Sequence, residues 1–292
     1  MNWKTISQHI SQCSGTNFIA KEAESLSGGC INQVFCLTDG NNLYCVKLNR
    51  ADHHDLFKAE HAGLLELAAA EAIRVPRPIC DGLSEGKSYL VLEYIKLSSD
   101  GNRGMAQAGQ QLANMHHTTA EQFGWQADNF IGTTPQFNQQ TESWCDFWRD
   151  QRLGYQLSLA KQNGYRGQLQ HRGERLLELL PLLLNHMPEA SLLHGDLWSG
   201  NIGFTVEGAP LIFDPAPYYG DREADLAMTE LFGGFSSEFY AAYRESWPLD
   251  AEYGVRKQLY NLYHILNHLN LFGGGYLREA EVMIDRLLAE LD

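Results

Sequence analysis

The stretch HGDLWSGN at positions 194–201 places polar side chains between two apolar runs. Asp196 and Asn201 stand five residues apart in it, and Asp214 follows Asn201 by thirteen residues, at the end of the apolar run PLIF. Asp and Asn between apolar runs are often plain turn residues. The same residue types can also do chemistry, because one carboxylate can accept the proton of a hydroxyl while other oxygen ligands hold a divalent cation.

The spacing favours chemistry over a simple turn, because it occurs in enzymes that transfer a phosphoryl group. HGDLWSGN matches the pattern H-R-D-L-x-x-x-N of the protein-kinase catalytic loop at its His, Asp, Leu and Asn positions. In that loop the Asp accepts the proton of the attacking hydroxyl and the Asn binds Mg²⁺. We therefore predict Asp196 as the catalytic base, and Asn201 and Asp214 as Mg²⁺ ligands beside the phosphates of ATP.

The N-terminal part of the chain supplies a candidate for the cation that such a reaction needs. Residues 22–49 read as three short strands and residues 57–73 as a helix. Lys47 stands in the middle of the third strand, where an ammonium group needs a partner, and Glu60 on the helix is the candidate. A strand lysine paired with a helix glutamate orients ATP phosphates in kinases. Taken alone, Lys47 could equally face water from an edge strand.

A glycine pair between the first two strands predicts the loop that would cover the phosphates. Gly28 and Gly29 would let the backbone approach phosphate oxygens closely, although ordinary hairpin turns often contain such a pair. Cys30 follows them. A thiol on such a loop would be exposed and its thiolate stabilised by nearby N–H groups, so Cys30 is a candidate redox switch that could form a disulfide with a second copy. The alternative is a small side chain that fits a turn.

The elements that must position these residues predict an α+β fold with two lobes. Another apolar strand at residues 88–97 follows the helix, so the N-terminal lobe is a small sheet with one main helix. Helical patterns dominate from about residue 100, beginning with a stripe of Met105, Ala108, Leu112 and Met115. We predict a nucleotide-binding lobe over residues 1–95 and a catalytic and substrate-binding lobe over residues 96–292.

Composition excludes several function classes. The 292 residues hold 36 acidic and 22 basic side chains, a net charge of −14, which disfavours nucleic acid and membrane surfaces as partners. No signal peptide is visible, so we expect a cytoplasmic protein. The 6 cysteines show no C-x-x-C pair, so structural zinc and a disulfide framework are not expected.

The histidines outside the motif are not expected to carry function. His264 and His268 are four residues apart on a predicted helix, but they have no Glu in the H-E-x-x-H position, so we do not predict a zinc site. His116 and His117 are expected at the surface or as cap residues.

With these residues in place, the chain resembles the fructosamine kinase (ketosamine 3-kinase) family, within the clan of aminoglycoside and choline kinase-like proteins. The resemblance covers nearly the whole chain and rests on the segments SGGCIN, VKLN, AEHAGLLEL, VPRPI, VLEY, LANMH, LLHGDLWSGNIGF, FDPAPYYGDREADLAM and LYHILNHLNLFG. It implies a protein-kinase-like fold and ATP-dependent phosphorylation of the third-carbon hydroxyl of a ketosamine. The phosphorylated product is unstable, so the activity would amount to deglycation of a small ketosamine, a glycated amine or a glycated protein.

The resemblance also implies roles for further residues. Glu93, Tyr94 and Ile95 would form the hinge that binds adenine through backbone groups. Trp198 and His194 would lie at the substrate, although Trp198 could equally support the loop. Asp225 would brace the catalytic loop, with substrate contact as the alternative.

The chain lacks the G-x-G-x-x-G, D-F-G and A-P-E segments of protein kinases, so a small acceptor fits better than a peptide substrate. Two other functions stay open: a kinase for another small hydroxyl-bearing amine of the aminoglycoside or choline type, and a non-catalytic nucleotide-binding homologue. The protein is expected to be a monomer or a homodimer.

Overall fold

The computed structural model describes residues 2–26, 32–98 and 104–291. It divides into two compact units. Unit 1 comprises Met1–Gly104 and Gly203–Pro215, and unit 2 comprises Met105–Ile202 and Ala216–Asp292.

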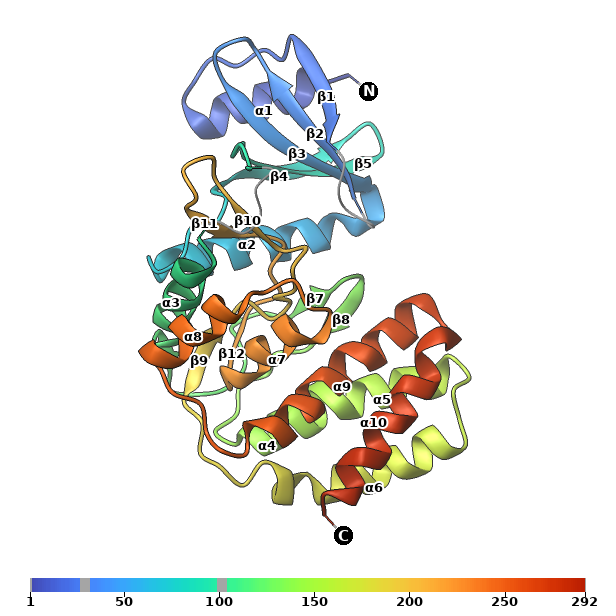
Figure 1. Ribbon diagram of the computed structural model, residues 1–292. Helices are drawn as coiled ribbons and strands as arrows, with labels where there is room; N and C mark the ends of the chain where they lie inside the picture. Colours follow the sequence, from blue (N-terminus) through green and yellow to red (C-terminus); the bar gives the residue numbers. More distant parts are fainter. Residues whose placement is uncertain (1, 27–31, 99–103, 292) are drawn as a thin grey trace. The chain divides into compact units, whose positions relative to one another are not determined.

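Unit 1 is built on an antiparallel sheet of five strands in the order β1-β2-β3-β5-β4 (Figure 1). Its elements are α1 (Lys4–Ser14), β1 (Glu22–Leu26), β2 (Gln33–Thr38), β3 (Leu43–Arg50), α2 (His54–Ala69), β4 (Pro78–Ser84) and β5 (Lys87–Glu93).

The two faces of this sheet pack against different helices. Successive side chains of a strand point to opposite faces. On β3, Val46 and Leu48 belong to the core cluster that also holds Ile6 and Ile10 of α1. Lys47, between them, therefore points to the opposite face, where α2 packs on β4 and β5.

A short hairpin from far along the chain completes unit 1. It consists of β10 (Ile202–Phe204) and β11 (Pro210–Ile212). The Ser98 N–H donates to the Phe204 carbonyl at 2.8 Å, and the Ile212 N–H donates to the Arg74 carbonyl at 3.0 Å. These bonds tie the hairpin, and Asp214 just after it, to the N-terminal part of the chain.

Unit 2 is mainly helical with a small three-stranded sheet in the order β12-β9-β6. Its elements are α3 (Met105–His116), β6 (Thr119–Ala120), β7 (Asn129–Ile131), β8 (Thr134–Gln136), α4 (Trp144–Phe147), a π-helical segment (Trp148–Leu153), α5 (Gly154–Gln162), α6 (Gln168–Leu183), β9 (Ala190–Leu193), β12 (Tyr218–Gly220), α7 (Glu223–Leu231), α8 (Ser237–Ser246), α9 (Tyr253–Phe272) and α10 (Leu277–Ala289).

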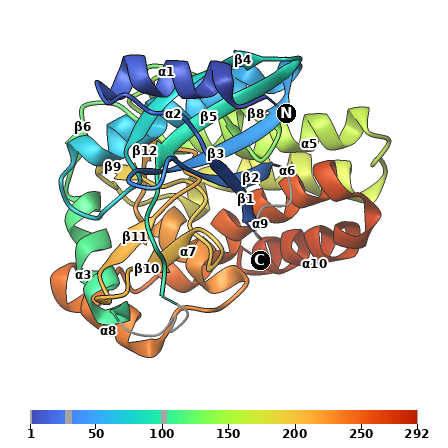
Figure 2. The same ribbon diagram turned by 90° about the horizontal axis from the view of Figure 1, so that it is seen from above.

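Helix pairs form the core of unit 2. Helices α9 and α10 run side by side, and α3 lies against α8 (Figure 2). The stripe of Met105, Ala108, Leu112 and Met115 on α3 is buried, as predicted. Among the described residues, no helix has both the length and the apolar character needed to cross a membrane.

The structure differs from the sequence-based expectations in three respects. Unit 1 carries a second helix, α1, and a fifth strand besides those predicted. The boundary after unit 1 falls at Gly104 instead of residue 95. The segment Gly203–Pro215 belongs to unit 1, because its hairpin forms hydrogen bonds with residues 74 and 98, whereas it was assigned to the C-terminal lobe.

Because α3 packs closely on α8, we predict that a side chain at Gly109 destabilises the protein. A Cβ at Gly109 would lie 2.1 Å from the carbonyl oxygen of Phe239. We expect Gly109→Ala to lower the free energy of unfolding by about 1–3 kcal/mol or more, because such overpacking pushes the helices apart. Gly254→Ala on α9 is the matched control, because a Cβ there meets nothing within 4 Å. Urea unfolding that shows equal stability for both variants would contradict this packing.

Candidate active site

In unit 1 the predicted lysine and two carboxylates form one cluster. Lys47 is only 5% exposed, and its Nζ donates to Glu60 Oε1 at 2.5 Å. The same Nζ forms an ion pair with Asp214 Oδ1. The sheet face opposite α1 thus brings together β3, α2 and the segment after the hairpin.

Burial and charge act against each other in this cluster. Burial alone would lower the pKa of Lys47, but Asp214 and Glu60 outweigh it and raise that pKa, so the ammonium stays charged. Burial raises the pKa of Glu60 to about 7, although Lys47 opposes the shift. The cluster therefore keeps a fixed cation beside a carboxyl group whose pKa lies above its ordinary value.

The backbone at Asp214 turns sharply. Its φ is +57°, in the left-handed region that few residues other than Gly, Asn and Asp occupy. Such backbone conformations cluster at functional sites, where the surrounding structure holds them in place. The turn follows β11 and brings the carboxylate to Lys47.

In unit 2 the HGDLWSGN segment forms the loop between β9 and β10. The half-buried Asp196 and the buried Asn201 are in contact across it. The Asn201 Nδ2 donates to the backbone carbonyl of Asp196 at 2.8 Å and to its Oδ2 at 3.3 Å. The five-residue spacing thus closes a compact loop in which the two predicted site residues are in contact.

The two glycines of the motif are required by close contacts. Gly195 has a φ of +81°, and a Cβ there would lie 2.0 Å from the Ala216 carbonyl oxygen. A Cβ on Gly200 would lie 2.2 Å from the Trp198 ring, so this glycine makes room for the indole. The loop conformation therefore depends on both positions.

Asp225 at the start of α7 holds the loop from beneath. Its Oδ2 accepts from the His194 N–H at 2.7 Å, and its Oδ1 accepts from the Gly195 N–H at 2.8 Å. Burial would raise the pKa of Asp225, but the hydrogen bonds from the His116 ring and the Gly195 N–H outweigh it and lower that pKa. The carboxylate is therefore charged, and each of its two oxygens accepts a hydrogen bond from the loop backbone.

A buried chain of hydrogen bonds supports Asp225. His116 Nε2 lies 3.2 Å from Asp225 Oδ2, and His116 Nδ1 lies 2.8 Å from the Tyr243 hydroxyl. Arg222 donates to the same hydroxyl at 3.1 Å. Burial lowers the pKa of His116, so a neutral ring donates to Asp225 and accepts from Tyr243.

One sequence-based expectation needs correction here. His116, expected at the surface or as a cap residue, is fully buried behind the loop. Sequence reasoning missed its positioning role, for which the only local signal was a histidine at the end of the LANMH helix. His194, expected at the substrate, is also fully buried, and its Nδ1 faces the Asp196 N–H at 3.2 Å. This contact lies within the loop, and the predicted contact of His194 with substrate stays a prediction.

Trp198 presents a large exposed side chain on the motif. It is 38% exposed, and its ring lies 6.4 Å from that of Phe232, which is 44% exposed. Phe232 in turn lies 5.2 Å from the ring of His268, centroid to centroid. Ser199 fits against Gly234, where a Cβ would come within 2.4 Å of the Ser199 Cβ. An open aromatic surface thus begins at the catalytic loop.

The other predicted nucleotide contacts are less constrained. Glu93 ends β5, and its N–H donates to the Arg77 carbonyl at 2.9 Å. Tyr94 and Ile95 follow β5 in a segment that is not part of a strand, and both residues are half-buried. Gly28, Gly29 and Cys30 lie outside the described residues, so the phosphate-covering loop and its redox switch stay predictions.

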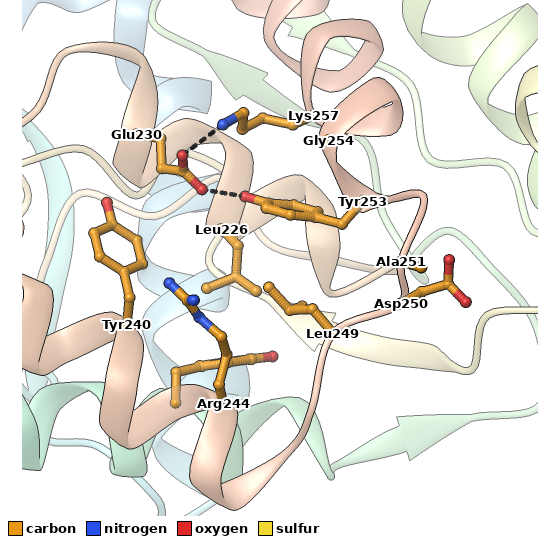
Figure 3. A pocket seen from close by; sticks show the side chains of 11 residues that line it. Leu226, Glu230, Tyr240, Arg244, Leu249, Asp250, Ala251, Tyr253, Gly254 and Lys257 are labelled. Carbon is orange, nitrogen blue, oxygen red and sulfur yellow. Dashed lines mark hydrogen bonds and ion pairs between the residues drawn. The ribbon is translucent and has the colours of Figure 1, made fainter.

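A separate cavity of about 340 Å³ lies in unit 2 beside α7, α8 and α9 (Figure 3). Within it Glu230 accepts from the Tyr253 hydroxyl at 2.6 Å and from Lys257 at 2.7 Å. Two acidic and two basic side chains line it, so it offers no excess of positive charge for a polyphosphate. None of the described residues that line it is a predicted site residue.

Comparison with known proteins gives one consistent family. The sequence model of the fructosamine kinase family matches residues 2–290. A probable ketoamine kinase from Synechocystis sp. is 50% identical over 98% of this chain and 97% of its own length. The chloroplastic protein-ribulosamine 3-kinase of Arabidopsis thaliana is 42% identical over 91% of this chain and 82% of its own length.

Solved structures agree with this result. A fructosamine-3-kinase candidate from Haemophilus somnus superposes with a TM-score of 0.88 and 30% identity, covering 97% of this chain and 96% of the other. A choline kinase from Streptococcus pneumoniae shares the fold alone, with a TM-score of 0.64 and 16% identity over 98% of this chain and all of the other. The architecture is therefore protein-kinase-like.

The buried lysine cluster predicts different stabilities for single and double variants. Lys47→Met leaves the Glu60 carboxyl group buried without its cation, so we expect the free energy of unfolding to fall by about 3 kcal/mol. Lys47→Met/Glu60→Gln should recover most of that loss, because no uncompensated charge remains on α2, while ATP turnover stays abolished in both. Denaturant unfolding without nucleotide measures the difference. Equal stability of the two variants would mean that Glu60 does not depend on Lys47.

Buried histidines predict a pH-dependent contribution to stability. Burial, with His268 nearby, lowers the pKa of His264 to about 3. The unfolded chain takes up this proton near pH 6.5, so acid favours unfolding, and between pH 7.5 and 5.5 His264 should cost about 1.4 kcal/mol. The raised pKa of Glu60 has the opposite effect, because it makes the folded state more stable as the pH falls over this range. The test therefore compares the pH dependence of each variant with that of the parent.

We therefore expect the stability advantage of the parent over His264→Gln to shrink by about 1.4 kcal/mol between these pH values. His171→Gln, at an exposed position of α6, is the control and should show no such change. The interpretation fails if urea unfolding gives both variants the same pH-independent difference.

Proposed function

The chain belongs to the fructosamine kinase family, and we propose that it transfers the γ-phosphoryl group of ATP to the third-carbon hydroxyl of a ketosamine. The observation that carries this proposal is the HGDLWSGN loop, held by two backbone hydrogen bonds to the buried Asp225 carboxylate. A catalytic group on a loop fixed in this way needs little reorganisation during the reaction.

Asp196 is proposed as the base. Its carboxylate is half-buried on the fixed loop, so it keeps access to an acceptor hydroxyl. The hydroxyl oxygen forms the new bond to phosphorus, its proton passes to Asp196, and ADP leaves with the electrons of the broken P–O bond. The contact from Asn201 Nδ2 at 3.3 Å orients the carboxylate for this transfer.

Lys47, Glu60, Asn201 and Asp214 are proposed to bind the nucleotide and its cation. Lys47 remains charged and would contact phosphate, with Glu60 orienting it. The donor types fit Mg²⁺, because Asp214 offers a carboxylate oxygen and Asn201 an amide oxygen. In Asn201 the amide nitrogen, and not this oxygen, forms the bond to Asp196. Mg²⁺ would neutralise charge that develops on the phosphates.

The adenine contacts are proposed at the end of β5. The Glu93 N–H already donates to Arg77, so these contacts would come from the following backbone at Tyr94 and Ile95. Gly28 and Gly29 would cover the phosphates, as the sequence predicts.

The sugar is proposed to pack on Trp198. The exposed indole lies over Gly200, and Phe232 extends the aromatic surface. The apolar face of a sugar stacks well on such a ring, and the adjoining amine carries a positive charge that aromatic faces attract. Free and protein-bound ketosamines share this chemistry, and the action is expected in the cytoplasm.

A panel of acceptors tests the reaction. We expect the protein with ATP and Mg²⁺ to phosphorylate one or more of fructosamine, ribulosamine and erythrulosamine, and not an aminoglycoside or choline, as read from product mass. Asp196→Asn should keep ATP binding and lose about 10²-fold or more of kcat, the scale of general base catalysis. Transfer to an aminoglycoside or choline but to no ketosamine would overturn the substrate class.

Two further results would contradict the roles given above. Full activity of Asp196→Asn would exclude this residue as the base. Trp198→Leu should raise KM for the ketosamine and leave KM for ATP unchanged, so an unchanged ketosamine KM would exclude the proposed sugar contact.

A further inference from the structure

A cluster of soft metal ligands lies in unit 1 on the sheet face opposite Lys47. His9 and Cys13 stand one turn apart on α1, so their side chains share a helix face. Cys80 comes from β4, on which α1 packs. One ligand atom from each of the three residues lies within 4.8 Å of the other two.

The packing around the cluster holds these side chains in place. Ile6 and Ile10 anchor α1 in the core cluster that also contains Cys80 and Tyr89. The Tyr89 hydroxyl, itself buried, lies 2.8 Å from His9 Nδ1 and restricts rotation of the imidazole. A second partner of this kind commonly orients a metal-binding histidine. The cluster is thus preorganised by contacts that do not involve a ligand.

We propose that His9, Cys13 and Cys80 bind one Zn²⁺ ion. Zn²⁺ favours tetrahedral sites of thiolate and imidazole ligands, and two thiolates neutralise its charge. Cys80 is 3% exposed, whereas Cys13 is exposed and His9 half-buried, so the ion can enter from solvent and take water as its fourth ligand. Mg²⁺ prefers oxygen ligands, so the magnesium that serves ATP does not compete here.

Binding exchanges protons for the metal. Cys80 is buried and lies against Cys13, and both sulfurs would bind the ion as thiolates. Each Zn²⁺ forms two Zn–S bonds and one Zn–N bond, and protons bound to the sulfurs pass to solvent. The bound ion links α1 to β4 and so stabilises the fold of unit 1.

The test is a cobalt titration of the full-length protein, purified without metal and kept reduced. We expect one Co²⁺ per chain, with thiolate-to-cobalt charge-transfer absorption and the visible bands of tetrahedral cobalt, and its displacement by Zn²⁺. Cys13→Ser should lose the charge-transfer band or weaken binding at least about tenfold, as should His9→Gln. Cys145→Ser removes a half-buried thiol in unit 2 and is the matched control, expected to bind as the parent does.

Thermal unfolding gives a second readout. One equivalent of Zn²⁺ should raise the melting temperature of the parent and of Cys145→Ser, and not that of Cys13→Ser. Cys13 is exposed, so this variant is expected to fold even if Cys80→Ser does not. Absence of a thiolate band, or a band unchanged in Cys13→Ser, would overturn the site. Neither readout involves kinase activity, so the outcome is independent of the proposed reaction.

Discussion

The conformation of the HGDLWSGN loop depends on one buried charge. Asp225 lies in the core of unit 2, where an unpaired carboxylate would cost several kcal/mol. It is stabilised by the N–H groups of His194 and Gly195 and by the His116 ring, so the charge is satisfied only while the loop keeps its conformation. This condition couples the loop to α3 and α8, since His116 ends the first helix and Tyr243 lies on the second.

The remaining motif residues follow from the same constraint. With the loop pulled onto Asp225, Gly195 passes so close to Ala216 that no side chain fits. Gly200 leaves space for the Trp198 ring, and Gly234 leaves space for Ser199. Ala216 and the segments HGDLWSGN, GDREADLA and FGGF (residues 232–235) are therefore parts of one packed arrangement in unit 2.

Features that depend on residues close together in the sequence could be predicted from it. The five-residue interval of Asp196 and Asn201 and the pairing of Lys47 with Glu60 could both be predicted from the sequence. Contacts between distant segments could not. Burial of His116 depends on Tyr243 and Asp225, more than a hundred residues away. Helix α1 was not predicted, because its buried face rests on little more than Ile6 and Ile10, and the thiols of Cys13 and Cys80 meet only through that packing.

The hairpin β10–β11 makes unit 1 discontinuous in sequence. The chain supplies residues up to Gly104, leaves to build most of unit 2, and returns with Gly203–Pro215. A fragment that stops at residue 95 would lack one of the two carboxylates that neutralise Lys47, and the Arg74 carbonyl would lose its bond from Ile212. During synthesis, unit 1 therefore cannot reach its final structure until the ribosome has passed the HGDLWSGN segment and added residues 203–215. The last part of unit 1 to be made thus carries Asp214, which pairs with Lys47.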